Sequence, residues 1–181
     1  PSKKWKKENL GESWYPGETL ISAIGQGFVL TNPLQLAHMT SIIASDGEVI
    51  EPKLINNEIK NPKINLNKYK SSIKIIKESM FEVVNKNKGT AFKSKSDEFV
   101  FSGKTGTSQV RRITVAERES EDFRKKEIEW KKRDHALFVG YMPHDKPKFS
   151  ISVVIEHGGS GASTAAPIAK QVFEYINKIK I

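Results

Sequence analysis

Apolar residues recur at helical spacing in three segments of the chain. A first helix is predicted to begin near Pro33 and to end at Ser45-Asp-Gly47, a second to cover roughly residues 71–86, and a third to follow His157-Gly-Gly-Ser-Gly161. Such a stripe is the face that an amphipathic helix buries against a core. The apolar faces comprise Leu34, Leu36, Ala37, Met39, Ile42 and Ile43 in the first helix, Ile73, Ile76, Met80, Phe81 and Val84 in the second, and Ile168, Ala169, Val172, Phe173, Ile176 and Ile179 in the third.

Polar and small residues at the ends of these segments agree with the helical pattern. Thr31 or Asn32 can cap the first helix, and Ser163 or Thr164 can cap the third. Each of these side chains can accept a hydrogen bond from a backbone N–H that lacks a partner inside the helix. The stretch Asn85-Lys-Asn-Lys-Gly89 is predicted to end the second helix.

Between the second and third helices the pattern changes to that of strands. One strand is predicted to begin near Phe99, and a hairpin is predicted from Ala136–Tyr141 and a second strand beyond Met142-Pro-His-Asp-Lys-Pro147. In that second strand Phe149, Ile151, Val153 and Ile155 alternate with Ser150, Ser152 and Val154. The order helix, helix, strand, strand, strand, helix predicts an α/β fold of the α+β kind, in which helices flank a largely antiparallel sheet.

Three other segments carry no such periodicity. Residues 1–20 are expected to be irregular, and residues 48–70 are expected to form a loop with a short extended piece near Val49-Ile50. Residues 111–134 interleave basic and acidic side chains, which is typical of a solvated helix or a mobile excursion with helix-spaced ion pairs. Trp130 can anchor the end of this charged excursion.

Length and composition limit the classes of protein to consider. A chain of 181 residues fits one domain with a real core, and no window approaches the roughly 18 to 20 apolar residues that span a bilayer. Because the chain has no cysteine, disulfides, thiolate metal sites and a cysteine nucleophile are excluded. Since it begins with Pro1 rather than Met, we expect a piece of a longer protein or a processed product.

The chain is strongly basic, with a formal charge of +9, which favours anionic partners. Its lysines are spread over residues 3–7, 60–77, 85–95 and 124–132 rather than gathered in one patch, and the aromatic-plus-basic signatures of nucleic-acid modules are missing. We therefore do not expect nucleic acid as a partner. A basic nucleic-acid binder stays open as an alternative that predicts salt-sensitive binding to any DNA.

The stretch Phe101-Ser-Gly-Lys-Thr-Gly-Thr-Ser-Gln-Val110 carries the candidate chemistry. On a strand beside a cleft, Lys104 offers a positive charge to a substrate carboxylate and helps to order proton transfers at a nucleophile. The hydroxyls of Thr105 and Thr107 can bind the same carboxylate, and Gly106 lets a substrate backbone lie against the strand. The backbone N–H of Thr107 can serve as one oxyanion-hole donor. Two glycines beside one lysine are thus expected to bring ligand and backbone close together.

An accidental Lys-Thr-Gly tripeptide in a turn is the alternative, but a wider resemblance favours a functional role. The motif and its Thr-Ser-Gln continuation resemble those of the penicillin-binding proteins and serine β-lactamases. Further stretches resemble the transpeptidase domain of class B penicillin-binding proteins, particularly the elongation type, penicillin-binding protein 2. These stretches are Trp14-Tyr-Pro-Gly-Glu-Thr, Ser22–Ala37 around Gly-Gln-Gly, Gly89-Thr-Ala91, Asp134–Tyr141 and Glu156–Gly161.

The resemblance implies that residues 1–181 are the C-terminal portion of a transpeptidase domain with the penicillin-binding protein and serine β-lactamase fold. Such an enzyme cross-links peptidoglycan stem peptides: a serine attacks a D-Ala-D-Ala bond, releases the last D-Ala and passes the acyl group to an amine. β-Lactams acylate the same serine. Lys104, Thr105, Gly106 and Thr107 are then the substrate-side wall of the site, and neither a metal nor an organic cofactor is implied.

The resemblance also implies partners and a location that this chain does not itself display. They are a membrane glycan polymerase, the elongation machinery, and attachment to the cytoplasmic membrane with this domain in the periplasm, the anchor being absent from the chain. A non-catalytic scaffold or peptidoglycan-binding module that retains the fold is the alternative. Upstream coding sequence without a Ser-x-x-Lys motif would favour that alternative.

Two further motifs of the family have no acceptable counterpart in this chain. Ser71-Ser-Ile-Lys74 has the Ser-x-x-Lys spacing of the nucleophile, but it follows the Gly-Gln-Gly segment, whereas the family's nucleophile precedes it. Ser120-Glu-Asp122 has the spacing of the proton-relay motif, but it lies after the lysine motif. The chain alone is therefore predicted to be inactive. Its four histidines lack ligand spacing, and His135 and His157 are expected to bond backbone groups near the site.

Overall fold

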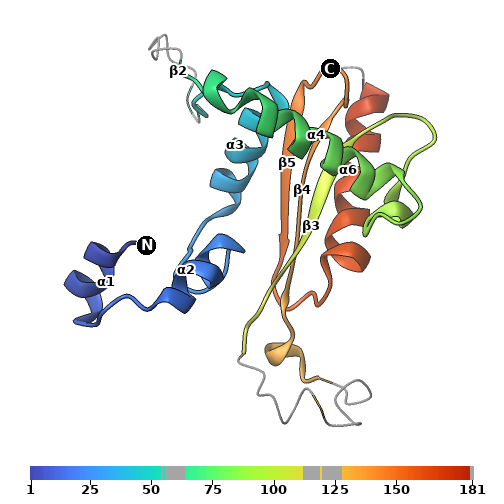
Figure 1. Cartoon of the computed structure of the whole chain (residues 1–181). Coiled ribbons are helices and arrows are strands. Elements are labelled where there is room, and N and C mark those ends of the chain that lie inside the picture. Colours follow the sequence, from blue (N-terminus) through green and yellow to red (C-terminus); the bar gives the residue numbers. More distant parts are fainter. Residues whose placement is uncertain (54, 56–63, 112–118, 120–127, 180–181) are drawn as a thin grey trace. The chain divides into compact units, whose positions relative to one another are not determined.

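The computed structural model describes residues 1–53, 55, 64–111, 119 and 128–179. The chain divides into two compact units, Pro1–Asn32 and Pro33–Ile181. Most of their helices and strands are labelled in Figure 1.

The first unit contains two short helices where an irregular segment was predicted. Helix α1 spans Lys3–Leu10 and helix α2 spans Pro16–Ala23, so that prediction is wrong. Helix α1 is strongly polar, and capping rather than an apolar stripe defines it: the Ser2 hydroxyl accepts from the Trp5 N–H at 3.1 Å. Pro16 occupies the first turn of α2, where a missing N–H costs nothing.

A lysine lies at the centre of this unit. The Lys6 ammonium is 2% exposed and donates to a carboxylate oxygen of Glu18 at 2.7 Å and to the Ser13 carbonyl at 2.9 Å, with Glu12 at 3.2 Å. The bond with Glu18 raises the pKa of Lys6 and lowers the pKa of Glu18. A charge-assisted hydrogen bond thus ties α1 to α2 in place of a large apolar core.

The second unit is built on a three-stranded antiparallel sheet. Strands β3 (Ser102–Ser108), β4 (His135–Met142) and β5 (Phe149–Ile155) follow one another in space, and Thr105 pairs with Phe138 in the register of β3 and β4. The predicted hairpin is confirmed. The first strand begins at Ser102 rather than near Phe99. A bend at Asp97 and Glu98 precedes it, and the Val100 carbonyl accepts from the His144 N–H at 3.0 Å rather than from a strand residue.

Helices cover both faces of this sheet and contact one of its edges near the beginning of β3. Helix α6 (Ala166–Ile179) packs on one face and α3 (Pro33–Ala44) on the other (Figure 1), and the end of α4 (Lys70–Asn85) contacts β3 near Phe101. The prediction of an antiparallel sheet flanked by helices is confirmed, as are the two helices near residues 33–45 and 71–86. Asp46 and Gly47, both with positive φ, end α3 as expected.

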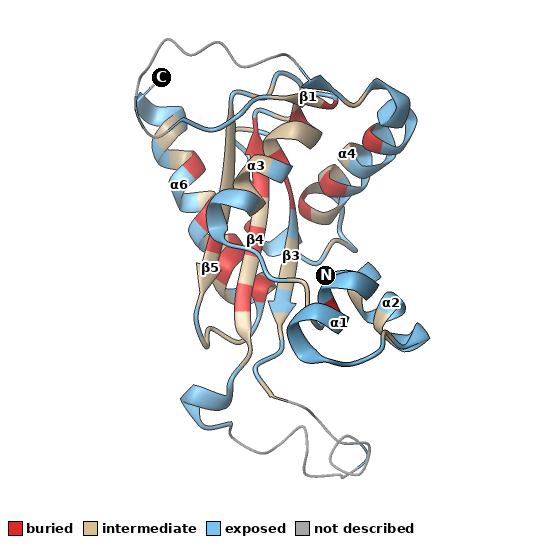
Figure 2. Cartoon of the chain, turned by 90° about the vertical axis from the view of Figure 1, so that its left-hand side faces the viewer, coloured by how far each residue is buried: buried red, intermediate tan, exposed pale blue. Residues whose placement is uncertain are grey.

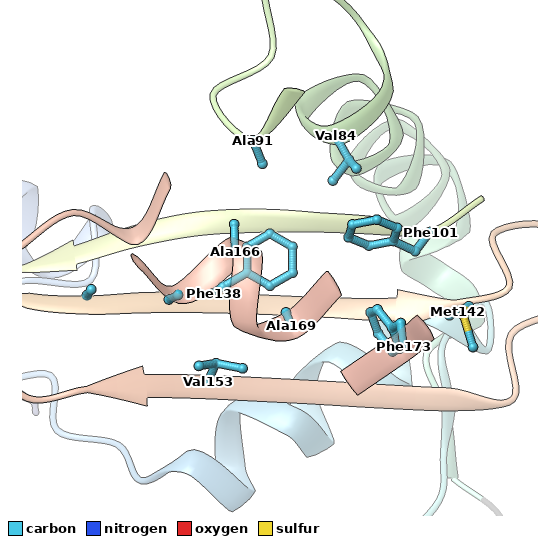
Figure 3. Packing of buried hydrophobic residues seen from close by; sticks show 11 residues of the cluster. Val84, Ala91, Phe101, Phe138, Met142, Val153, Ala166, Ala169 and Phe173 are labelled. Carbon is cyan, nitrogen blue, oxygen red and sulfur yellow. The ribbon is translucent and has the colours of Figure 1, made fainter. Parts of the chain in front are cut away.

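The core lies between the sheet and α6, with a smaller cluster on the opposite face. The rings of Phe101, Phe138 and Phe173 meet there, with centroids of Phe101 and Phe173 5.4 Å apart (Figure 3). Buried residues line the facing surfaces of the strands and helices (Figure 2). Alternation along β4 explains the two clusters: Phe138 points to α6, whereas Tyr141 packs with Ala44 of α3 and Met80 of α4.

The remaining elements are short. Strand β1 (Glu48–Val49) pairs with β2 (Ile64–Asn65), so the extended piece predicted near Val49 is confirmed. The 3₁₀ turns are η1 (Asn67–Tyr69), η2 (Phe92–Ser94) and η3 (Trp130–Lys132), and a π-helical turn, η4 (Gly161–Ala165), leads into α6.

Several sequence predictions require correction or lie outside the described residues. Neither Ser163 nor Thr164 caps the last helix, because η4 starts the helical turns at Gly161 and the Thr164 hydroxyl donates instead to the Gly158 carbonyl at 2.9 Å. Most of the charged excursion at 111–134 lies outside the described residues. Six residues assigned to apolar faces are in fact exposed, namely Leu34, Met39, Ile76, Ile168, Val172 and Ile179.

Candidate active site

Strand β3 carries all four candidate residues on one edge of the sheet. In the described part of the chain β3 pairs with β4 alone, so no strand occupies its other edge, which the end of α4 contacts near Phe101. Lys104 and Thr107 are exposed, and Thr105 and Gly106 are half-buried. The Lys104 ammonium donates to the Thr105 carbonyl at 2.7 Å, which holds the charge beside the strand.

Thr105 has a partner from outside the sheet. Its Oγ1 lies 2.9 Å from Oγ1 of Thr90, in the loop that follows α4. The two residues are 15 positions apart, and the sequence linked Gly89-Thr-Ala91 to the site only through a resemblance. This contact is a feature that sequence reasoning missed, because no local pattern encodes it.

The two glycines of the motif serve different purposes. A Cβ at Gly103 would lie 2.1 Å from the Phe138 ring, so the packing of the core requires a glycine at this position. A Cβ at Gly106 would lie 3.2 Å from the Leu137 Cβ, which is a much milder conflict. Core packing therefore accounts for Gly103, whereas close approach of a ligand stays a prediction for Gly106.

A third glycine packs against the motif. A Cβ at Gly161 would come within 2.4 Å of the Gly106 carbonyl oxygen and 2.3 Å of the Leu137 carbonyl oxygen. Gly161 is buried and begins η4. The glycine-rich stretch after β5 thus lets η4, which leads into α6, lie directly against the backbone of β3 and β4.

A buried polar cluster supports the beginning of β3. The Ser102 hydroxyl is 2.8 Å from Nδ1 of His144, and the Tyr141 hydroxyl is 3.5 Å from the same atom. Ser102 and Tyr141 are fully buried and pair directly across β3 and β4. Burial raises the pKa of the Tyr141 hydroxyl, and its hydrogen bond with Ser102 opposes that shift. His144 thus joins the turn after β4 to the beginning of β3.

Two histidines stand at the other end of β3. Nδ1 of His135 accepts from the His157 N–H at 2.9 Å, and Nδ1 of His157 is 3.1 Å from the Arg133 carbonyl. The expectation that both bond backbone groups is confirmed. The Trp130 ring packs edge-on against the His157 ring, and the two ring centroids are 4.8 Å apart. Trp130 thus anchors the end of the charged excursion. Among the described residues no three potential metal ligands come together.

The geometry of α4 supports the rejection of Ser71 as a nucleophile. The end of α4 is beside β3, where the Asn85 side chain donates to the Phe101 carbonyl at 2.9 Å. Ser71 precedes Asn85 by fourteen residues, which is about 20 Å along a helix. Lys77 lies between Ser71 and Asn85 on α4. Its ammonium donates to the Ala44 carbonyl, at the end of α3, at 3.0 Å. Ser120-Glu-Asp122 lies outside the described residues.

Comparison with known proteins defines the family. The model of the penicillin binding protein transpeptidase domain matches residues 3–174. Curated relatives called peptidoglycan D,D-transpeptidase MrdA, from Haemophilus influenzae and Acinetobacter baumannii, are each 34% identical over 97% of this chain. The chain belongs to the penicillin-binding protein transpeptidase family.

Solved structures agree with this assignment. Penicillin-binding protein 2 in complex with MreC from Helicobacter pylori matches 99% of the chain with a TM-score of 0.81 and 30% identity, and this chain covers 31% of it. Penicillin-binding protein 2 of Pseudomonas aeruginosa in complex with WCK 5153 matches 97% with a TM-score of 0.76 and 34% identity, and 37% of it is covered. The resemblance to the penicillin-binding protein 2 type, and the fold that it implied, are confirmed.

The chain spans a minor part of its relatives. It covers 28% of the H. influenzae protein and 26% of the A. baumannii protein. In the described part of the chain, none of the helices combines the length and apolar character needed to cross a bilayer.

Proposed function

We propose that this chain supplies the Lys-Thr-Gly wall of the active site of a serine-type peptidoglycan D,D-transpeptidase. The observation that carries the proposal is the position of Lys104–Thr107 on an edge strand of the sheet. Among the described residues, this strand pairs with no strand other than β4. An extended peptide can add to such an edge through main-chain hydrogen bonds, and small side chains beside it leave room for the peptide. The substrates are stem peptides that end in D-Ala-D-Ala.

Each residue of the wall has a role that its chemistry suits. Lys104 attracts the substrate carboxylate and orders proton transfers at the nucleophile, and the hydroxyls of Thr105 and Thr107 donate to the same carboxylate. Gly106 lets the peptide lie against the strand. The Thr107 N–H donates to the oxyanion that forms on the attacked carbonyl, a contribution of about 3 kcal/mol to the transition state.

The nucleophile comes from the part of the protein that this chain does not contain. A serine there attacks the penultimate D-Ala carbonyl and expels the terminal D-Ala. The acyl-enzyme then passes the acyl group to an amine on a neighbouring stem peptide, and water competes poorly if the cleft excludes it. β-Lactams are proposed to react with the same serine, because their strained amide and carboxylate meet the same wall.

We further propose that the full-length protein works at the cytoplasmic membrane, with this domain in the periplasm. Its partners there are a membrane glycan polymerase and the elongation machinery. The solved complex of H. pylori penicillin-binding protein 2 with MreC supports the second of these partners, since that protein is a relative of this chain.

Labelling with a fluorescent penicillin tests the proposal. Membranes of cells that make the protein are labelled, and an antibody to this segment identifies its band. A labelled band well above 20.4 kDa is expected, while the isolated chain keeps its intact mass in the presence of a β-lactam because it lacks the serine. A labelled larger band that disappears on competition with unlabelled penicillin supports the enzyme. An unlabelled band at 20.4 kDa would favour the scaffold alternative, and a stoichiometric adduct on the isolated chain would restore Ser71 as a nucleophile.

A further inference from the structure

Thr90 contacts the motif although it lies outside the strand. Its Oγ1 is 2.9 Å from Oγ1 of Thr105, whose side chain leaves β3 on the face that carries Phe138. Thr90 is exposed, so packing alone does not account for a hydroxyl at this position. A polar contact at the rim of a candidate site calls for a functional explanation.

The residues on either side of Thr90 hold it rigidly. A Cβ at Gly89 would lie 2.2 Å from the Val83 carbonyl oxygen, so the loop packs directly against the last turns of α4. The Ala91 N–H donates to the same Val83 carbonyl at 3.0 Å, and Ala91 is 1% exposed in the core. The Thr90 hydroxyl is therefore presented from a fixed backbone, which favours preorganised contacts.

The chemistry of a ligand carboxylate sets the direction of the bond between the two hydroxyls. A carboxylate only accepts hydrogen bonds, so a Thr105 hydroxyl that binds it must use its one proton for that contact. The Thr90 hydroxyl must then be the donor in the pair. Donation from Thr90 also polarises the Thr105 O–H bond and strengthens its donation outward.

We propose that Thr90 is a positioning residue that donates to Thr105 and thereby directs the Thr105 proton at the ligand carboxylate. This inference rests on the proposed function, because it requires a ligand carboxylate at Thr105. It makes the loop after α4 part of the specificity determinant for carboxylate-bearing ligands.

The test compares a carboxylate ligand with its neutral counterpart on the full-length protein. The second-order rate of acylation is measured for a penicillin and for the methyl ester of the same penicillin. The wild type should favour the acid. Thr90→Val, which keeps the shape and removes the hydroxyl, should lower the acid-to-ester ratio about threefold to tenfold, the factor expected for one hydrogen bond. Thr90→Ser, which restores a hydroxyl, should restore the ratio.

Two controls separate positioning from structural damage. A structural effect would slow acid and ester alike and leave the ratio unchanged. In a Thr105→Val background, where the target hydroxyl is absent, Thr90→Val should change the ratio no further. If Thr90→Val fails to fold, Thr90→Ala at this exposed position provides the same comparison.

The outcomes distinguish this inference from the proposed function. A wild type that reacts with neither ligand overturns the proposed function and the inference together. A wild type that reacts but does not discriminate acid from ester, or a Thr90→Val variant with the wild-type ratio, overturns the inference and leaves the transpeptidase standing.

Discussion

The two halves of β3 differ in what surrounds them. Ser102 and Gly103 at the start of the strand are buried, as is Phe101 just before it. Ser102 bonds His144, and Gly103 lies against the Phe138 ring. From Lys104 onward the strand is exposed or half-buried, and its free edge faces away from β4. The first half of the strand is thus packed into the core, and this packing fixes the position of the second half, which carries the proposed substrate wall.

The comparison shows that glycine is needed for different physical reasons on the two sides of Lys104. Gly103 has no room for a Cβ because an aromatic ring occupies the space, whereas Gly106 has nearly enough room and belongs to the proposed substrate wall. Mutations in the first half should therefore act on stability, and mutations in the second half should act on acylation.

The largest effect is expected from Gly103→Ala. Its Cβ would lie 2.1 Å from the Phe138 ring and 2.6 Å from the Val139 carbonyl oxygen, so the core must shift, at a cost of about 3 kcal/mol. Urea unfolding of the full-length protein measures the loss. Gly106→Ala is the matched control and should cost less than about 1 kcal/mol while slowing acylation. Equal losses of stability in the two variants would abolish the distinction between the halves.

Lys104→Ala, unlike Gly103→Ala, should slow acylation without lowering stability. Because Lys104 is exposed, the urea midpoint should stay unchanged, while the rate of acylation by penicillin should fall about 100-fold as a preorganised charge is lost. Lys93→Ala, at an exposed position in η2, controls for net charge and should leave the rate unaltered. An acylation rate within about twofold of the wild type in Lys104→Ala would remove Lys104 from the site.

The smallest effect is a dependence of stability on pH at Tyr141 of β4, which pairs with Ser102 in the buried half of β3. Burial raises the pKa of Tyr141 in the folded protein above the unfolded value of about 10. The neutral hydroxyl is favoured by folding, so this contribution is complete below pH of about 10 and is lost as pH rises from there through the folded pKa. Tyr141→Phe should flatten this alkaline decline in urea midpoint, whereas Tyr175→Phe, at an exposed position on α6, should not. An unchanged decline in Tyr141→Phe would contradict the assignment.

Much of the fold could be predicted because its signals are local. The apolar stripes of α3 and α4 and the alternation in β5 depend on residues a few positions apart, and the structure has elements there. The polar helix α1 was missed for the converse reason. It is stabilised by the Ser2 cap and by the contacts of Lys6 rather than by an apolar face.

The candidate site was predictable only in part. Lys104–Thr107 are contiguous, so their spacing could be recognised in the sequence. The contact of Thr90 with Thr105 and that of Ser102 with His144 join residues 15 and 42 positions apart, and no periodicity relates them. The reason for Gly103 likewise depends on where the Phe138 ring lies.

By itself, then, the sequence determined the helices with apolar faces, the hairpin and the motif, because each is written in neighbouring residues. Only the tertiary structure decided that the motif lies on an edge strand, which glycine serves the core, and which hydroxyl meets Thr105. Those properties arise when a chain brings distant segments together, since close packing lets one ring or one carbonyl oxygen determine what a neighbouring position can hold.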